Sequence, residues 1–236
     1  MKIMEKKVLI FAHRGASKLA PENTLKAFQK AIELGADYVE FDVHETKDGE
    51  IVIIHDDDVE RTAGVKGKIK EMTLKELKEL DFGEGEKIPT LKELIELAKG
   101  KIGLQCEIKV RGIAKKIVEH FKEADLIDST IISSFIHDEL LAVKKYAPEI
   151  KLAPLVFGIK KNKMIREAIE HKYYAIHPFY KFINQKFLDE AHKNNIKINT
   201  WTVDSKSRMK KLIEMRIDGI ITNDVELAKE VLSEFQ

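Results

Sequence analysis

Three carboxylates and a lysine occupy alternate positions in two apolar segments of the chain. Glu40 and Asp42 alternate with apolar residues in the first segment, and Glu107 and Lys109 do so in the second. Residues i and i+2 of a β-strand face the same side, so each pair points away from its apolar neighbours. Converging carboxylates resist burial unless a positive charge lies among them. We therefore predict one divalent cation, Mg²⁺ or Ca²⁺, on Glu40, Asp42 and Glu107, since zinc would favour more His or Cys. The alternative is that Glu107 only pairs with Lys109 and Glu40 with another lysine.

Two histidines follow apolar segments that end close to these acids in the expected fold. His13 is followed by Arg14, whose planar guanidinium can bind an anionic oxygen, and His55 ends another segment. Two imidazoles beside a cation could supply a general base and a general acid. A histidine at the end of a strand is more commonly structural, and Arg14 could pair with Glu22. The functional interpretation depends on both histidines falling where the acids fall.

Positioning these residues requires a fold that gathers the ends of several strands. Short β-branched segments alternate with segments whose apolar residues recur near every 3.6 positions. The predicted strands cover 7–12, 38–43, 102–109, 130–135, 151–157, 173–178, 196–203 and 219–222, and the predicted helices 23–34, 91–99, 113–123, 138–146, 163–170, 185–193, 206–215 and 225–234. This alternation predicts an α/β fold, the TIM (β/α)8 barrel, whose active sites lie at the C-terminal strand ends. An open doubly wound sheet is the rival, but no GxGxxG loop follows Ala12.

The second unit is longer than the others and predicts a small insertion after strand two, at about 44–89, within a single domain covering 1–236. A β-hairpin would turn at Lys47-Asp48-Gly49, where Asp-Gly supplies the positive-φ residues. A loop of this length is usually functional or structured, so we expect it to form part of the active-site wall. Its apolar residues would form either the insertion's own core or a groove for lipid: Val65, Ile69, Met72, Leu74, Leu77, Leu80 and Phe82.

Three further residues receive mainly structural interpretations. Trp201, the single tryptophan, lies near the end of the seventh predicted strand, where it could bind the carbon face of a small polyol or pack in the core. Cys106 faces the predicted helix layer and should be a small core residue. His177 ends the sixth strand and should face the barrel mouth or its rim.

Composition excludes several classes of protein. The chain has 236 residues, with 41 Lys and Arg against 40 Asp and Glu, so its balanced charge argues against a nucleic-acid binder. Its single cysteine cannot form an internal disulfide. The apolar run after the basic N-terminus is too short for a secretory signal or a membrane span. We expect a cytoplasmic protein without integral membrane association, a monomer or homodimer. Lysine makes up 35 of the 41 basic residues and glutamate 26 of the 40 acidic ones, a bias that resembles hyperthermophile usage, although AT-rich codons give the same pattern.

Taken in order, the motifs resemble those of the glycerophosphodiester phosphodiesterase family across essentially the full length of the chain. The matching motifs are His13-Arg14-Gly15, Pro21-Glu22-Asn23-Thr24, Gly35-Ala36-Asp37, Glu40-Phe41-Asp42-Val43, Thr46-Lys47-Asp48-Gly49, His55-Asp56, Arg61-Thr62, Pro89-Thr90-Leu91, Glu107-Ile108-Lys109, Ser134-Phe135, Trp201-Thr202-Val203 and Asp218-Gly219-Ile220-Ile221-Thr222. The chain departs from the family motifs at two places near the pocket expected to bind the alcohol part of the substrate. Asp204 stands where Asn often follows Trp-Thr-Val, and Asn223-Asp224-Val225 replaces a common Asp-x-Pro.

This resemblance implies metal-dependent hydrolysis of glycerophosphodiesters to sn-glycerol 3-phosphate and an alcohol, on a TIM barrel. The resemblance implies that His13 and His55 act as general acid and general base, in an order that it does not assign. It also implies that Glu40, Asp42 and Glu107 bind the cation, and that Arg14 and Lys109 bind the phosphate. The nucleophile is either the glycerol 2-hydroxyl, bound to the metal and giving a cyclic phosphate, or water. The alternatives are lysophospholipase D activity on lysophospholipids and a non-catalytic glycerophosphate-binding barrel. The second alternative predicts a lost histidine or carboxylate, and none is missing.

Overall fold

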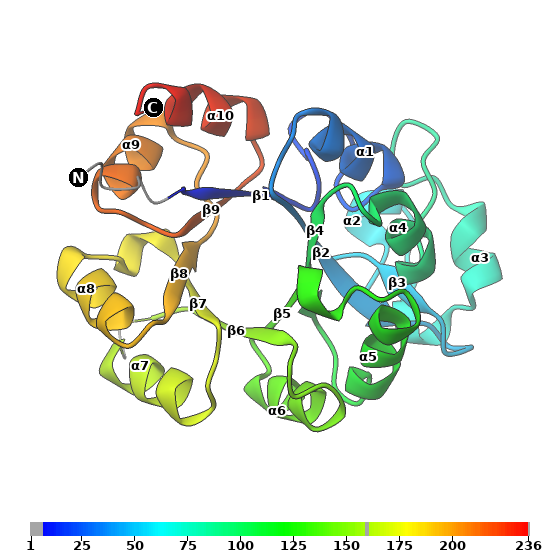
Figure 1. Ribbon diagram of the computed structural model, residues 1–236. Helices are drawn as coiled ribbons and strands as arrows, with labels where there is room; N and C mark the ends of the chain where they lie inside the picture. Colours follow the sequence, from blue (N-terminus) through cyan, green and yellow to red (C-terminus); the bar gives the residue numbers. More distant parts are fainter. Residues whose placement is uncertain (1–6, 159–160, 236) are drawn as a thin grey trace.

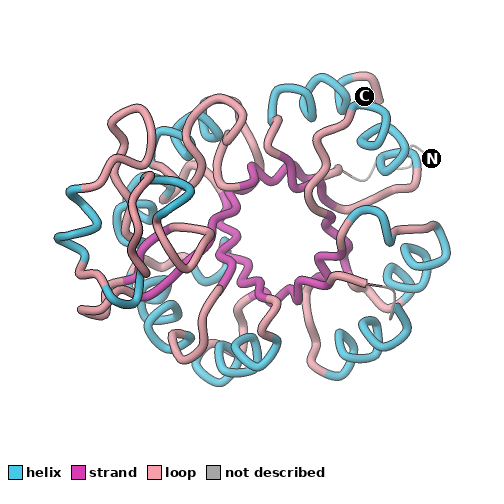
Figure 2. Tube along the Cα trace, turned by 180° about the vertical axis from the view of Figure 1, so that it is seen from behind, coloured by secondary structure: helices cyan, strands magenta, loops and turns pink. Residues whose placement is uncertain are grey.

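The computed structural model describes residues 7–158 and 161–235. Eight parallel strands form a closed barrel with helices around it, which confirms the predicted TIM barrel (Figures 1 and 2). The barrel strands are β1 (Leu9–His13), β2 (Tyr38–Glu45), β4 (Gly103–Ile108), β5 (Thr130–Ser134), β6 (Lys151–Val156), β7 (Ala175–Pro178), β8 (Lys197–Thr200) and β9 (Gly219–Thr222). The helices of the outer layer are α1 (Leu25–Glu33), α4 (Leu91–Ala98), α5 (Ala114–Glu123), α6 (His137–Tyr146), α7 (Lys161–Glu170), α8 (Gln185–Lys193), α9 (Lys206–Glu214) and α10 (Val225–Ser233).

Most of these bounds lie within two residues of the predicted ones, and the differences have local causes. Helix α1 begins at Leu25 rather than at Asn23 because Thr24 is its N-cap: the Thr24 hydroxyl accepts a hydrogen bond from the Ala27 amide. Asn23 instead adopts a left-handed backbone with φ 56°. Strand β8 ends at Thr200, before the predicted end, and Trp201 forms only an isolated bridge to Phe179.

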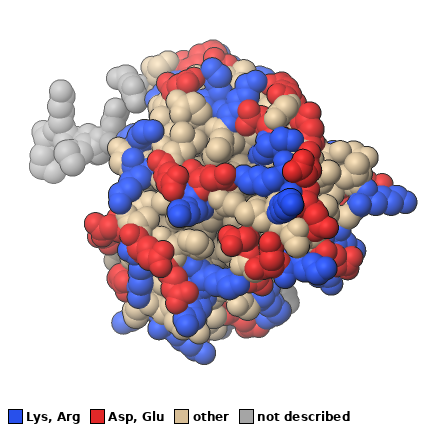
Figure 3. All heavy atoms as spheres, turned by 90° about the vertical axis from the view of Figure 1, so that its right-hand side faces the viewer, with Lys and Arg blue, Asp and Glu red and all other residues tan. Residues whose placement is uncertain are grey.

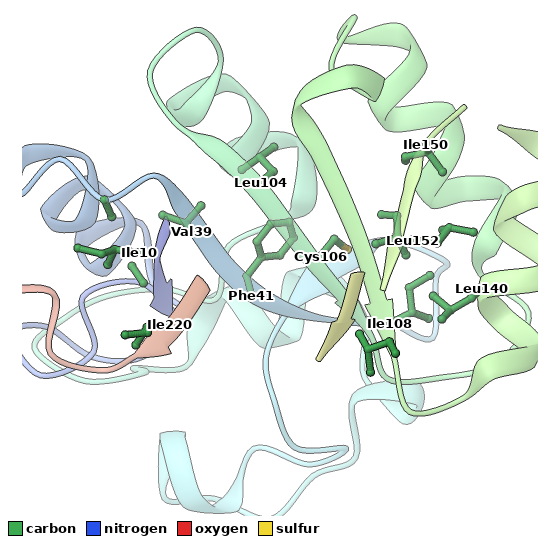
Figure 4. Packing of buried hydrophobic residues seen from close by; sticks show 14 of the residues in the cluster. Ile10, Val39, Phe41, Leu104, Cys106, Ile108, Leu140, Ile150, Leu152 and Ile220 are labelled. Atoms are coloured by element: carbon green, nitrogen blue, oxygen red, sulfur yellow. The ribbon is translucent and has the colours of Figure 1, made fainter. Parts of the chain in front are cut away.

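Strand β1 closes the barrel by pairing with β9 on one side and with β2 on the other. The register places His13 beside Glu40, and the β2–β4 register places Asp42 beside Glu107. The alternating apolar residues of β2 and β4 are buried against the helices, and Figure 4 shows part of this packing around Phe41. The predicted acid-bearing faces of β2 and β4 therefore point inward. Cys106 is fully buried in the outer packing layer, as predicted.

Apolar side chains also fill the inside of the barrel below the active-site end. They form a separate cluster centred on Phe11, Ile131, Ala153, Ala175 and Ile221. The Phe11 and Tyr38 rings stack within it, with centroids 4.7 Å apart. The interior is therefore a packed layer rather than a pore, as is usual for this fold.

The long segment between β2 and α4 has its own small core. It contains β3 (Ile51–Ile53), antiparallel to β2, followed by α2 (Glu60–Ala63), the short 3₁₀ helix η1 (Ile69–Glu71) and α3 (Leu74–Glu79). Its buried apolar residues pack together: Val52, Ile54, Val59, Ile69, Leu77, Phe82 and Ile88. Of the residues considered for a lipid groove, Val65 is 43% exposed, whereas the other six pack in this cluster. Figure 3 faces this side of the molecule and shows acidic and basic residues intermixed over it.

Gly15 makes the turn that carries the chain from β1 toward α1. Its φ is +79°, and a Cβ there would lie 2.7 Å from the Ala27 backbone, so only glycine fits without strain. The turn keeps His13 and Arg14 at the barrel mouth. In the described part of the chain, no helix is long and apolar enough to cross a membrane.

Candidate active site

The three predicted metal-binding carboxylates meet at the C-terminal end of the barrel. Glu40 and Asp42 come from β2 and Glu107 from β4, and each offers an oxygen within 4.8 Å of those of the other two. All three side chains are buried. The structure thus brings together residues that lie up to 67 positions apart in the sequence, because β2 and β4 are neighbours in register.

Two cations lie against this triad. The Lys109 ammonium donates to Glu107 Oε1 at 2.7 Å and lies 3.4 Å from Asp42 Oδ1. Arg14 Nε lies 3.5 Å from Asp42 Oδ2, and the Arg14 amide donates to Glu40. Arg14 also forms the alternative ion pair considered from the sequence, with Glu22 at 2.9 Å. The Glu107–Lys109 and Arg14–Glu22 pairs therefore form, but two side-chain cations cannot compensate every carboxylate of the cluster.

The charge state of the triad reflects this imbalance. Burial and the neighbouring Asp42 raise the pKa of Glu107 to about 7. Burial, together with the charges of Asp42 and Glu107, also raises the pKa of Glu40 well above its ordinary value. Burial disfavours ionisation of Asp42 as well, but Lys109 and Arg14 outweigh it and lower its pKa. The neighbouring cations thus favour ionisation of Asp42, whereas burial and repulsion oppose ionisation of Glu40 and Glu107.

The triad fits a hard divalent cation. Its donors are all carboxylate oxygens, which Mg²⁺ and Ca²⁺ prefer. The buried Asp42 Oδ1 accepts no hydrogen bond from any residue that the structure describes, and buried polar atoms usually have a partner. A bound cation would satisfy this oxygen and would favour ionisation of Glu40 and Glu107.

His13 and His55 line the same pocket, and each is held through Nδ1. His13 Nδ1 lies 2.8 Å from Asn223 Oδ1, and its Nε2 lies 4.0 Å from Glu40. His55 Nδ1 lies 2.6 Å from the Asp56 carboxylate. Burial and the neighbouring Arg14 lower the pKa of His13, although Asn223 opposes this shift. The Nε2 atoms of both rings are therefore the ones left for a ligand.

A chain of ion pairs connects the two histidine-bearing loops. Arg61 donates to Asp56 at 2.6 Å and to both oxygens of Glu22, and Glu22 in turn pairs with Arg14. Sequence reasoning considered Glu22 only as a partner of Arg14 and gave Arg61 no role of its own. The left-handed Asn23, which the sequence placed at the start of the first predicted helix, instead donates to Asp42 at 2.9 Å.

The opposite wall of the pocket is apolar. It is formed by Phe135, Leu155, Trp201 and Ile221, which come from β5, β6, β8 and β9 or follow these strands. Trp201 is half-buried: its indole N–H donates to the His177 carbonyl at 2.8 Å, and its ring contacts Phe135 edge-on. Trp201 thus lines the pocket and packs in an aromatic cluster, and its contact with a polyol stays a prediction. Next to Trp201, Phe157 is 70% exposed.

His177 lies deeper than the sequence predicted. The expectation that it faces the mouth or rim is wrong, because its side chain is fully buried inside the barrel and does not line the pocket. Its two ring nitrogens lie 3.2 Å from Gln105 Nε2 and 3.0 Å from Asn199 Nδ2. Gln105 also lines the pocket, so His177 and Asn199 lie in a polar layer directly beneath it. The position of a residue along its strand indicates the side that it faces, but its depth depends on where the neighbouring strands end.

The buried His177 should make the stability of the protein depend on pH. Burial lowers its pKa to about 3 from an ordinary 6.5. Between these values the unfolded chain binds a proton that the folded protein excludes, so the free energy of unfolding should decrease as pH falls from 6.5 to 3. One such proton contributes about 1.4 kcal/mol per pH unit.

Urea unfolding of wild type and His177→Gln at several pH values between 4 and 6.5 tests this expectation. The variant should lose the contribution of one proton to the slope of unfolding free energy against pH. The same substitution at His120, on the surface of α5, controls for loss of an imidazole. Equal slopes for wild type and His177→Gln would contradict the expectation.

Comparisons with known proteins identify the family of this chain. Residues 13–227 match the model of the glycerophosphoryl diester phosphodiesterase family. The chain belongs to this family. It is 44% identical over 233 residues to a glycerophosphodiester phosphodiesterase of Caldanaerobacter subterraneus subsp. tengcongensis, covering 93% of this chain and 96% of that protein. The family resemblance found in the sequence is therefore confirmed, and the chain is an enzyme of the phosphodiester hydrolase class.

Solved structures of related proteins share the fold. A glycerophosphodiester phosphodiesterase from Thermotoga maritima is 33% identical, with a TM-score of 0.84 over 95% of this chain and 98% of that one. A phosphodiesterase from Oleispira antarctica, solved in complex with the product sn-glycerol-3-phosphate, is 29% identical, with a TM-score of 0.88 over 95% and 96% of the two chains. The family fold thus extends over nearly the whole of this chain.

Proposed function

We propose that this chain hydrolyses glycerophosphodiesters to sn-glycerol 3-phosphate and an alcohol in a reaction that depends on Mg²⁺ or Ca²⁺. The observation that carries the proposal is a pocket lined by two histidines, two cationic side chains and the carboxylates of Glu40 and Glu107, with Asp42 beside these two. The product bound by the Oleispira antarctica relative supports the same substrate class.

Arg14 and Lys109 are proposed to bind the phosphate. A phosphodiester carries one negative charge, and charge increases on its oxygens as the pentavalent centre forms. Both cations line the pocket and are mostly buried, so water screens them little and they would stabilise the growing charge more than the ground state. The carbon atoms of the substrate would lie against the apolar wall, including Trp201.

Glu40, Asp42 and Glu107 would hold the divalent cation, which supplies charge neutralisation when bound. Their own contribution is to bring three carboxylate oxygens within 4.8 Å of one another at the C-terminal end of the barrel. Asn23 supports this arrangement by fixing one oxygen of Asp42, and the Arg14 amide fixes one oxygen of Glu40. Such supporting hydrogen bonds orient the ligands of a metal site.

His13 and His55 are proposed as acid and base. One of them takes a proton from the nucleophile, and the other gives a proton to the leaving alkoxide. The nucleophile is water or the glycerol 2-hydroxyl, and in the second case a cyclic phosphate forms and water then opens it. His55 belongs to the segment 44–89, so this insertion would contribute a catalytic residue and not only a wall of the pocket. Because the proposed active site needs residues of both the barrel and the insertion, we infer that 1–236 act as one domain.

Release of sn-glycerol 3-phosphate from glycerophosphocholine and glycerophosphoethanolamine tests the proposal. The assay is run with Mg²⁺, with Ca²⁺ and with EDTA, and His13→Ala serves as the blank. We expect release with a divalent cation, none with EDTA and almost none in the blank. Folded protein that releases no product with either metal would contradict the proposal. Lysophosphatidylcholine would then test the lipid alternative, and binding without turnover the non-catalytic one.

A further inference from the structure

Asn223 lies between the His13 imidazole and an acidic residue that plays no part in the mechanism above. Asn223 follows β9, and its side-chain Oδ1 lies 2.8 Å from His13 Nδ1. At the other end of the amide, Asn223 Nδ2 donates to Asp204 Oδ2 at 2.6 Å. Asp204 follows β8, so loops from three neighbouring strands (β1, β9 and β8) meet in one row of hydrogen bonds.

Asp204 is tied firmly to the Asn223 segment although the residue is exposed. Its Oδ1 accepts hydrogen bonds from the Asn223 amide at 2.8 Å and from the Thr222 hydroxyl at 2.9 Å. The Ser17 hydroxyl lies 2.9 Å from Asn223 Oδ1 and 2.8 Å from the His13 carbonyl. The Asn223 side chain is therefore fixed by contacts on both sides.

The chemistry of these groups determines where the His13 proton lies. An ionised carboxylate only accepts hydrogen bonds, so the Asn223 NH₂ group must face Asp204 and its oxygen must face His13. A carbonyl oxygen also only accepts, so His13 Nδ1 must carry a hydrogen. A neutral imidazole has a single N–H, and His13 Nε2 therefore keeps its lone pair toward the pocket.

We propose that Asp204 and Asn223 are positioning residues that hold the neutral His13 ring as its Nδ1–H tautomer and thereby reserve Nε2 for proton exchange with the substrate. This inference rests on the proposed role of His13 as an acid or a base. In either role the proton is exchanged at Nε2, because Nδ1 is occupied by Asn223, and the neutral ring must carry its hydrogen at Nδ1.

Exchanging the two side chains provides a test. In Asp204→Asn, the new amide oxygen would still accept from the Asn223 backbone and Thr222, which turns its NH₂ toward the NH₂ of Asn223. Asn223 must then rotate and present NH₂ to His13, which forces the opposite tautomer. In Asn223→Asp, two carboxylates face each other at hydrogen-bond distance and repel. The double exchange restores a donor opposite an acceptor at every contact.

We expect each single variant to lower kcat for glycerophosphocholine by about 10²-fold, because a misplaced imidazole proton costs up to about 10⁴-fold. KM should change by less than about threefold, because the phosphate contacts remain. The double variant should recover most of the lost kcat. Asp224→Asn is the matched control, because it makes the same Asp→Asn change at the residue that follows Asn223. The new amide retains an oxygen for the Leu227 amide that Asp224 caps, and kcat should be unchanged.

The tautomer of His13 can also be determined without an activity assay. Long-range ¹H–¹⁵N correlation spectra of the Mg²⁺-loaded, ¹⁵N-histidine-labelled protein at pH 8 distinguish a protonated Nδ1 from a protonated Nε2, and His13→Ala identifies the signal. We expect Nδ1–H in wild type and in the double variant, and Nε2–H in Asp204→Asn. Wild-type kcat and tautomer in Asp204→Asn would overturn the inference, as would a double variant as impaired as the singles. If the wild type releases no product, the proposed function fails, and the spectra alone still decide the tautomer.

Discussion

Glu107→Gln is expected to lower kcat/KM for glycerophosphocholine by about 10³-fold or more and to weaken binding of the divalent cation, because charge stabilisation by a bound metal is worth several kcal/mol. Glu107 is one of three carboxylates that could hold the ion, and glutamine retains its shape while losing the negative charge. Isothermal titration with Mg²⁺ and Ca²⁺ measures the binding, and product release measures the rate.

The stability of the metal-free variant separates this role from a structural ion pair with Lys109. In the metal-free fold the pKa of Glu107 is about 7, against 4.5 in an unfolded chain. Between these values the unfolded chain ionises first, so this carboxyl makes the fold less stable as pH rises from 4.5 to 7. Glutamine removes that contribution, and at pH 8 without metal the variant should be at least as stable as wild type.

A different outcome would identify Glu107 as a structural residue. If its main role were the pair with Lys109, the variant would lose stability and would bind the cation as wild type does. Glu45→Gln is the matched control, because Glu45 ends the neighbouring strand β2 and pairs with Lys116 outside the pocket. This control should retain both activity and cation affinity.

His13→Ala and His55→Ala should each lower kcat by about 10²–10⁴-fold, the range typical of general acid–base catalysis. KM should change little, since the proposed phosphate contacts are made by Arg14 and Lys109. Both rings border the pocket rather than the packed interior, so their removal should affect unfolding only slightly. Steady-state kinetics with His120→Ala as control check this prediction, and turnover near wild type in either variant would remove that histidine from the mechanism.

The choice of leaving group then assigns the two roles. A glycerophosphodiester of p-nitrophenol has a leaving group that departs without a proton, so loss of the general acid should matter little for this substrate. The variant that recovers on the p-nitrophenyl ester but not on glycerophosphocholine has lost the acid, and the variant impaired on both has lost the base. Equal impairment of both variants on both substrates would contradict separate roles for His13 and His55.

Local sequence patterns determined much of this molecule. Alternation along β2 and β4 placed Glu40, Asp42 and Glu107 on the face opposite the apolar residues, and the structure has them there. Repeated strand and helix patterns gave the barrel, since the period of the apolar residues is a property of each segment alone. The ordered motifs also identified the family, which the comparisons confirm.

Other features depended on contacts between distant segments. The sequence showed Asn223 only as a departure from the family motifs. Its side chain contacts His13, 210 residues away in sequence, because β9 pairs with β1 when the barrel closes. Asn23 was placed at the start of a predicted helix, but its left-handed backbone, whose amide donates to the Arg14 carbonyl, brings its side chain to Asp42. The insertion could also have formed a lipid groove. In the structure, most of its apolar side chains from Val52 to Ile88 instead pack against one another in a small core.

The division has a physical reason. The side toward which a residue points follows from the geometry of its own strand. The sequence by itself therefore determined which side of their strands the three acids face, that His13 and His55 lie at strand ends, and the fold class. Depth in the barrel and partners across it follow from strand register and closure, which depend on long-range pairing. Only the tertiary structure therefore buried His177 beneath the pocket, paired Glu22 with Arg61 and placed the Asn223 amide on His13.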